Sequence, residues 1–269
     1  MYRLLALDLD GTLLRRDGIV DERDIAAIGE LQAAGVIVTI VTGRLHSGAT
    51  FAAQACRIDG AIGCVDGSHL VELTSGRTLV HHGMAEDLVA VVRDTLARHE
   101  LTAFVFDATG IHHDHAGAPY ADYVRTWSPN LRIVEQDVAW QTDPLGAVVV
   151  GEPHAVAAAH AALREHAARL YSVRFEVWTH PGKEAMIMRA AGATKGTALA
   201  ELCRRAGISL AEAVAVGDWI NDVPMFEVAG RSFAMGTAPD EVRAKATDVL
   251  SATAFDGGGI AEAIRQGWG

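Results

Sequence analysis

The sequence has few cysteines, no long apolar run and a shortage of positive charge. Its three cysteines, Cys56, Cys64 and Cys203, lack the spacing of a metal site, which favours buried, reduced thiols. No apolar run approaches the ~18 residues that span a bilayer, and a carboxylate, Asp8, comes too early for a signal peptide. These absences predict a cytoplasmic protein.

Acidic residues outnumber basic ones along the chain. The 23 Lys and Arg against 34 Asp and Glu give a formal net charge of −11. A surface of this sign disfavours nucleic acids and anionic membranes as partners, whereas one local pocket can still be positive and bind a phosphorylated small molecule. We therefore expect a small-molecule partner, no nucleic acid and no membrane, and a monomer or small homo-oligomer.

Apolar residues are plentiful, at 50% of 269, so the chain can bury a substantial core. The two ends of the sequence alternate short β-branched or apolar runs with helical patterns, which predicts a doubly wound α/β domain with a parallel sheet. The strands that we expect are 4–9, 36–41, 213–216 and 232–235, and the helices are 21–34, 195–206, 221–229 and 260–265.

The middle of the chain has a different pattern, typical of an α+β insertion. Two amphipathic helices, 86–99 and 155–168, stand beside strand-like runs at 101–106, 131–135, 147–150 and 174–180. We therefore divide the chain into an outer domain, 1–83 and 187–269, and an inserted domain, 84–186.

Two carboxylates follow the first expected strand. Asp8 and Asp10 stand two residues apart, which places them on one side of the strand end, and Gly11 lets the chain turn away. Like charges this close repel unless a cation lies between them or one holds a proton. The simpler interpretation is an acidic turn, because Asp-Gly is a common turn pair.

Three further groups follow later strands or begin a helix. Thr42 and Gly43 offer a hydroxyl and backbone N–H groups for a phosphate oxygen, and Lys195 at a helix start makes an anion site. Oxygen-rich side chains suited to Mg²⁺ follow the 213–216 strand, namely Asp218, Asn221 and Asp222. Taken singly, these residues also fit a strand end, a solvated lysine and a helix N-cap.

The four groups together point to phosphoryl transfer. In order, they are an acid pair, a hydroxyl, a lysine and an acid pair, in a layout that repeats at strand ends. They would supply a nucleophilic carboxylate, a carboxylate for proton transfer, a metal site and neutralisers of phosphate charge.

The sequence resembles the haloacid dehalogenase (HAD) superfamily, and within it the Cof-like subfamily IIB phosphatases, over essentially its whole length. The motifs that carry the resemblance are Asp-Leu-Asp-Gly-Thr-Leu-Leu at 8–14, Val-Thr-Gly-Arg at 41–44, Lys-Gly at 195–196 and Gly-Asp-Trp-Ile-Asn-Asp-Val-Pro-Met at 217–225. The resemblance implies a Rossmann-like doubly wound parallel-sheet core with an inserted α+β cap domain of type IIB. It also implies a Mg²⁺-dependent phosphatase of small metabolites, sugar phosphates among them, that works through an aspartyl-phosphate.

The resemblance implies a role for each motif residue. Asp8 would be the nucleophile and Asp10 the acid and base. Mg²⁺ would lie between Asp8, the backbone carbonyl of Asp10 and Asp218, and Asp222 would orient Asp218 or a bound water. The residues that would hold phosphate oxygens are Thr42, Gly43, Lys195 and Asn221.

Some features fall outside this pattern. Family members often carry Asn-Gly-Ala after the third core strand, where this chain has Asp66-Gly67-Ser68, and an acid there could alter substrate preference. The histidine-rich stretch 111–115 could bind a metal, although we expect a solvated turn. We expect Tyr120, Trp127 and Trp178 to pack within the cap rather than reach substrate.

Two other functions fit the motifs. A phosphotransferase of the phosphomannomutase type has a similar core and cap, but it would need clustered cations for a second phosphate, and the insertion has only scattered arginines. A non-catalytic phosphate-binding module would be favoured by loss of Asp8, Asp10 or Lys195, and all three are present.

Overall fold

The computed structural model describes all residues, 1–269, and divides into two compact units. The core unit is Met1–Gly43, Ala49–Val80 and Thr194–Gly269, and the inserted unit is Arg44–Gly48 and His81–Ala193. The predicted boundaries, 83/84 and 186/187, lie three residues after the first of these junctions and seven before the second.

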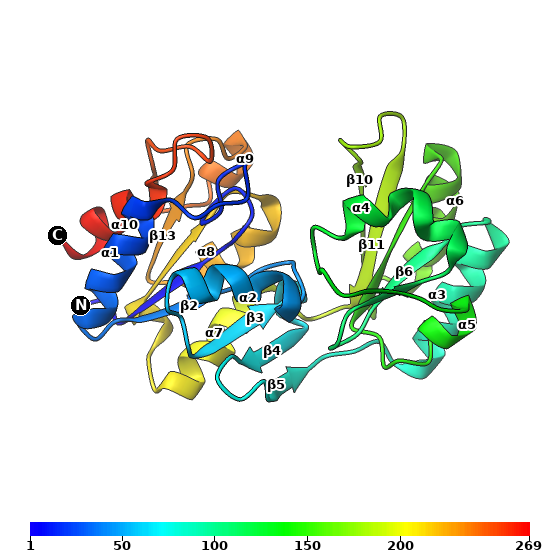
Figure 1. Cartoon of the computed structure of the whole chain (residues 1–269), viewed down its shortest axis with the longest axis horizontal. Helices are drawn as coiled ribbons and strands as arrows, with labels where there is room; N and C mark the ends of the chain where they lie inside the picture. Colours follow the sequence, from blue (N-terminus) through cyan, green and yellow to red (C-terminus); the bar gives the residue numbers. More distant parts are fainter. The chain divides into compact units, whose positions relative to one another are not determined.

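The core unit is built on a parallel sheet (Figure 1). Its strands in spatial order are β14 (Asp248–Val249), β13 (Arg231–Ala234), β12 (Ala213–Gly217), β1 (Leu4–Leu7) and β2 (Ile37–Ile40). All four neighbouring pairs are parallel. All five strands therefore run in the same direction and end at the same edge of the sheet, as the sequence pattern predicted.

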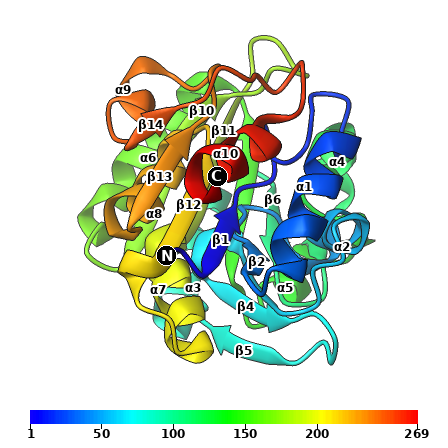
Figure 2. The same ribbon diagram turned by 90° about the vertical axis from the view of Figure 1, so that its left-hand side faces the viewer.

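Helices cover both faces of this sheet. On one face, α7 (Lys195–Ala206) and α8 (Val223–Val228) bury Leu199 and Phe226 against small residues of β1 and β12. The alternate residues of those strands point to the other face, where α1 (Glu22–Ala33) contacts α10 (Gly259–Trp268), as Figure 2 shows. This two-sided cover confirms the doubly wound α/β prediction.

The helix ends follow local capping chemistry. Asp21 accepts a hydrogen bond from the Arg23 N–H at the start of α1. At the start of α7, the Thr194 hydroxyl accepts from the Thr197 N–H, and the Thr197 hydroxyl accepts from the Thr194 N–H. This reciprocal capping fixes the backbone on either side of Lys195.

The rest of the core unit extends the sheet. Strand β3 (Ala61–Cys64) continues from a parallel bridge between Val41 and Gly63 and begins an antiparallel sheet with β4 (His69–Glu72) and β5 (Thr78–His81). The other helical segments are α2 (His46–Ala55), η1 (Val65–Gly67), η4 (Leu210–Glu212), η5 (Ile220–Asp222) and α9 (Asp240–Arg243). The turn η1 follows β3 directly and carries Asp66.

The inserted unit is a mixed sheet with helices. The strands in spatial order are β10 (Leu170–Glu176), β11 (Glu184–Ala190), β9 (Gly146–Gly151), β6 (Ala103–Phe106), β7 (Ile111–His113) and β8 (Leu131–Ile133). The helical segments are α3 (Glu86–Arg98), η2 (His115–Tyr120), α4 (Ala121–Val124), α5 (Gln136–Ala139), α6 (Pro153–Leu163) and η3 (Arg164–His166). Helices α3 and α6 bury one apolar core against alternate residues of β6, β9 and β11.

One strand prediction in the inserted unit was misplaced, and one strand was not predicted. The expected strand at 174–180 covers the end of β10 and the loop that follows it, and no strand was expected at β11. Strand β11 is paired along both edges, with β9 and with β10. It crosses the predicted boundary at residue 186, which explains why the inserted unit continues to Ala193.

The first three residues of the histidine-rich stretch, 111–113, form the buried strand β7 rather than a solvated turn, whereas His115 is exposed. His112 on β7 is 4% exposed, and its Nε2 lies 2.8 Å from Asp107 Oδ2. Asp107 Oδ1 accepts from the N–H groups of Thr109 and Gly110, which closes the turn before β7. Trp178 also departs from the prediction, because its side chain is 78% exposed.

All three cysteines are buried and none forms a disulfide. Burial raises the pKa of the Cys56 thiol to about 12. None of the helices offers an apolar stretch of the length that a bilayer requires.

Candidate active site

The register of the core sheet places three predicted site residues at one edge. Leu7 pairs with Ile40 on one side and with Val216 on the other, so β1, β2 and β12 end at the same level. Asp8 follows β1 directly, Thr42 comes two residues after β2, and Asp218 follows β12. The carboxyl edge of a parallel sheet is where open α/β folds bind ligands.

Lys195 connects the first and last motifs through its side chain. Its Nζ lies 2.5 Å from Asp8 Oδ1 and 2.5 Å from Asp222 Oδ1. The lysine is 1% exposed, although it begins helix α7, where a solvated side chain would be the ordinary case. A buried ammonium of this kind is stable only when it is paired, so the two carboxylates and the lysine depend on one another.

Asp222 is held through both of its oxygens. While Oδ1 pairs with Lys195, Oδ2 accepts from the backbone N–H of Asp218 at 2.8 Å and of Trp219 at 2.9 Å. This carboxylate therefore fixes the backbone that carries Asp218, and it has little capacity left for another ligand.

Asp218 lies against the turn of the first motif. The Thr12 hydroxyl donates to Asp218 Oδ1 at 3.2 Å. Gly11 has φ of +81°, and a Cβ at this position would overlap the Asp218 carboxylate. A glycine is therefore required twice over, for the left-handed backbone and for the close approach of the carboxylate.

Asp8, Asp218 and Asp222 form a carboxylate cluster in which one oxygen of each lies within 4.8 Å of the others. Burial, followed by the charge of Asp222, raises the pKa of Asp8 well above its ordinary value, against the opposing effect of Lys195. The same two causes raise the pKa of Asp218 to about 7. Burial lowers the pKa of Lys195, but the charges of Asp222 and Asp8 raise it by more than burial lowers it. The pKa is therefore raised overall, and the lysine remains protonated.

The donor set of this cluster fits a hard divalent cation. All of its side-chain donors are carboxylate oxygens, which Mg²⁺ prefers, and three carboxylates against one lysine leave an excess of negative charge. Since both oxygens of Asp222 already accept hydrogen bonds or an ion pair, Asp8 and Asp218 are the side chains best placed to hold the ion.

The predicted phosphate-binding residues meet around Asp66. Asn221 Nδ2 donates to Asp66 Oδ1 at 2.9 Å, and the Asp66 backbone N–H donates to the Thr42 carbonyl at 3.0 Å. Asp66 Oδ1 would also lie 3.4 Å from a Cβ placed on Gly43. The loops after β2, β3 and β12 are thus joined through one residue, Asp66, by its backbone N–H and by its carboxylate.

A family model described as haloacid dehalogenase-like hydrolase matches residues 5–264. The chain belongs to this family. The resemblance to Cof-like HAD phosphatases of subfamily IIB is thereby confirmed, and the chain is a phosphoric monoester hydrolase of the HAD superfamily.

Named relatives match over nearly the whole chain. It is 27% identical to the pyridoxal phosphate phosphatase of Escherichia coli, over 94% of this chain and 95% of that protein. It is 30% identical to a phosphoglycolate phosphatase of Halobacterium salinarum, over 94% and 92% of the two chains. A solved structure described as a HAD subclass IIB sugar phosphatase shares the fold, with a TM-score of 0.80, 19% identity and 98% of each chain covered.

Two other residues of the motifs lie in different surroundings. Asp10 is exposed, two residues beyond Asp8. Arg44 lies in the inserted unit and donates to the carbonyl of Gly48.

Two polar residues at the site were not among the predicted site residues. Thr12 belongs to the first motif, and its position two residues after Asp10 was a usable signal. Asp66 was noted only as a departure from the family pattern, although it follows β3 as Asp8 follows β1. For both Thr12 and Asp66, the signal is a polar side chain in the loop that follows a core strand.

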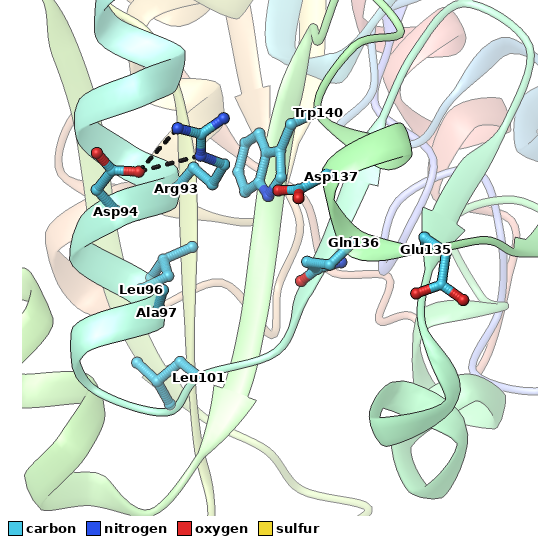
Figure 3. Close-up of a pocket in the computed structure, with 9 residues that line it drawn as sticks. All are labelled: Arg93, Asp94, Leu96, Ala97, Leu101, Glu135, Gln136, Asp137 and Trp140. Atoms are coloured by element: carbon cyan, nitrogen blue, oxygen red, sulfur yellow. Dashed lines mark hydrogen bonds and ion pairs between the residues drawn. The ribbon is translucent and has the colours of Figure 1, made fainter.

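A separate pocket of about 550 Å³ lies within the inserted unit (Figure 3). Helix α3 contributes Arg93 and Asp94, which pair with each other, and the segment around α5 contributes Trp140. None of the predicted site residues lines this pocket.

Proposed function

We propose that the protein is a Mg²⁺-dependent phosphatase that hydrolyses small phosphorylated metabolites, sugar phosphates among them, through an aspartyl-phosphate. The observation that supports this most strongly is the position of Lys195 Nζ, 2.5 Å from oxygens of both Asp8 and Asp222, with Asp218 in the same cluster. A nucleophile, a metal-binding carboxylate and a cation for phosphate charge are thus within a few ångströms of one another.

In the first half of the reaction, Asp8 attacks phosphorus. A bond forms between an Asp8 carboxylate oxygen and phosphorus while the ester P–O bond breaks, and Asp10 gives its proton to the leaving alkoxide. In the second half, Asp10 takes a proton from the water that attacks phosphorus, and the Asp8–phosphorus bond breaks to release inorganic phosphate. Asp10 is exposed and therefore open to the solvent from which that water comes.

In this proposal Asp8, the backbone carbonyl of Asp10 and Asp218 hold the ion. The bound cation offsets the repulsion between the Asp8 carboxylate and the anionic phosphate. Asp222 positions Asp218 through the backbone N–H that it accepts from. Thr12 acts in the same direction, since its hydroxyl donates to Asp218.

The phosphate oxygens are proposed to be held by Lys195, Asn221, the Thr42 hydroxyl and the Gly43 N–H. Lys195 is protonated and fixed in place, so it can neutralise charge that develops on phosphorus oxygens without reorganising.

Sugar phosphates as substrates rest on the family resemblance. The relatives are named for chemically different phosphate esters, pyridoxal phosphate and phosphoglycolate, so the leaving group must be found by assay. We also propose a cytoplasmic location, which rests on the cysteine content of the sequence.

The test is hydrolysis of p-nitrophenyl phosphate with Mg²⁺ and with excess chelator, for the wild type and for Asp8→Asn. Wild-type activity should require Mg²⁺, and Asp8→Asn should be inactive but folded. Asp59→Asn is a matched control, because it removes an exposed carboxylate from a loop of the same unit. Hydrolysis by Asp8→Asn at the wild-type rate would show that another group is the nucleophile.

A further inference from the structure

Asp66 places a carboxylate among the four residues proposed to hold phosphate. It is 7% exposed, and its backbone has φ of +49°, a left-handed conformation that few non-glycine residues adopt. Its Oδ1 accepts from Asn221, its N–H donates to the Thr42 carbonyl, and its charge acts on the Lys195 ammonium.

These contacts have a structural consequence. Asn221 lies in the turn η5 after β12, and Thr42 lies two residues beyond the end of β2, so both residues belong to loops at the sheet edge rather than to the strands. The bond from Asn221 Nδ2 to Asp66 Oδ1 fixes the amide plane, so the second N–H of the same nitrogen has a defined direction. Asp66 therefore sets the geometry of a donor that phosphate would use.

The same contacts have an electrostatic consequence. Lys195 is the one cation among the proposed site residues, and it already pairs with Asp8 and Asp222. The charge of Asp66 adds to the charges of Asp8 and Asp222 and opposes the binding of a dianion beside Lys195, because buried charges interact strongly.

We propose that Asp66 is a positioning residue that fixes Asn221 and at the same time weakens the retention of free phosphate. A hydrolase of this kind must release inorganic phosphate in every turnover, and a neighbouring carboxylate favours release. The proposal rests on the proposed function in one respect, because it takes Thr42, Gly43, Lys195 and Asn221 as the phosphate-binding residues.

Two substitutions separate these effects. Asp66→Asn keeps an oxygen that can accept from Asn221 but removes the charge, whereas Asp66→Ala removes both. In calorimetric titrations with inorganic phosphate and Mg²⁺, Asp66→Asn should bind phosphate roughly tenfold more tightly than the wild type. With p-nitrophenyl phosphate, the KM of Asp66→Ala should be about tenfold higher than that of Asp66→Asn, because the two variants share the loss of charge and differ in the hydrogen bond that positions Asn221.

Charge dependence distinguishes this role from a merely structural one. Inorganic phosphate gains its second negative charge between about pH 6 and 8, whereas sulfate is a dianion throughout. The affinity ratio of Asp66→Asn to wild type should therefore grow with pH for phosphate and stay constant for sulfate. Asp59→Asn, which removes an exposed charge from the same unit, should match the wild type in both titrations.

The outcomes are decisive in both directions. Phosphate binding by Asp66→Asn that is equal to or weaker than that of the wild type, or not measurable, overturns the proposal. So does a ratio that rises equally for sulfate and phosphate. If the wild type fails to hydrolyse p-nitrophenyl phosphate, the proposed function fails, and the calorimetric comparison still decides whether Asp66 opposes anion binding.

Discussion

Replacing Lys195 by methionine tests the charge balance on which the site depends. The substitution keeps the length and the apolar stem of a side chain that is 1% exposed, and it removes the ammonium that lies 2.5 Å from Asp8 and from Asp222. Breaking a buried ion pair by removing one partner costs about 3–5 kcal/mol, because the other charge is left without compensation. In the presence of excess chelator, we expect the Tm of Lys195→Met to lie roughly 10 °C below that of the wild type.

The pH dependence of this loss has a definite sign. In the wild type, burial and the charges of Asp222 and Asp218 raise the pKa of Asp8, and Lys195 alone among the main causes lowers it. Without the lysine, the folded variant binds protons that the unfolded chain releases above the ordinary aspartate pKa of about 4. Its stability must therefore decrease as pH rises, so the difference from the wild type should be larger at pH 8 than at pH 5.

Thermal melting and p-nitrophenyl phosphate hydrolysis are the assays, each with and without Mg²⁺. Mg²⁺ should raise the Tm of Lys195→Met more than that of the wild type, because in the variant it can bind carboxylates that no longer pair with the lysine. Lys245→Met is the matched control, since Lys245 is exposed and pairs with Glu227 at 3.8 Å, an interaction worth about 0–1 kcal/mol. A Tm for Lys195→Met within 2 °C of both the wild type and this control, or full activity, would refute the reasoning.

Substitutions at three further positions, Gly11, Asp24 and Asp107, test single contacts. Gly11→Ala should lower the rate of p-nitrophenyl phosphate hydrolysis by about a hundredfold, because its Cβ must displace the Asp218 carboxylate; an unchanged rate contradicts this. Asp24→Ala should lower the free energy of unfolding by about 2–4 kcal/mol in urea titrations, since Asp24 accepts from two N–H groups at the start of α10. Burial raises the pKa of Asp24, so the stability of the wild type relative to Asp24→Asn should decrease as pH rises above about 4, and an increase would be the wrong sign. Burial raises the pKa of Asp107, but the hydrogen bonds from Thr109 outweigh this effect and lower the pKa overall. Asp107→Ala should therefore lower the free energy of unfolding, followed by circular dichroism, by about 2–4 kcal/mol. This loss of stability should persist above about pH 4 and become smaller below it.

Strands β1 and β12 could be predicted because each is a continuous apolar run that is followed by polar or glycine residues. Such runs are what a strand buried on both faces requires, and β1 and β12 fall inside or within one residue of the predicted ranges. Helix α2 was missed because its buried residues, such as Ala49 and Ala52, are small and give weak amphipathic contrast. In the inserted unit, β7 carries two histidines on a buried strand, where a polar composition misled the prediction. His112 is tolerated there because Asp107 accepts from it, a partner that local pattern cannot supply.

The residue types of the candidate site were predictable for a reason that also limits the prediction. Strand ends at one sheet edge meet, so polar residues in those places indicate a common site, but their pairing depends on packing between distant segments. Lys195 lies 187 residues after Asp8, and only the packing of α7 on the sheet brings its Nζ between two carboxylates. The contact that joins Asn221 to Asp66 spans 155 residues in the same way. Because buried charges are costly until they are paired, the residues proposed for chemistry must also hold the folded core together, and a substitution at any of them has to be judged on stability and on catalysis separately.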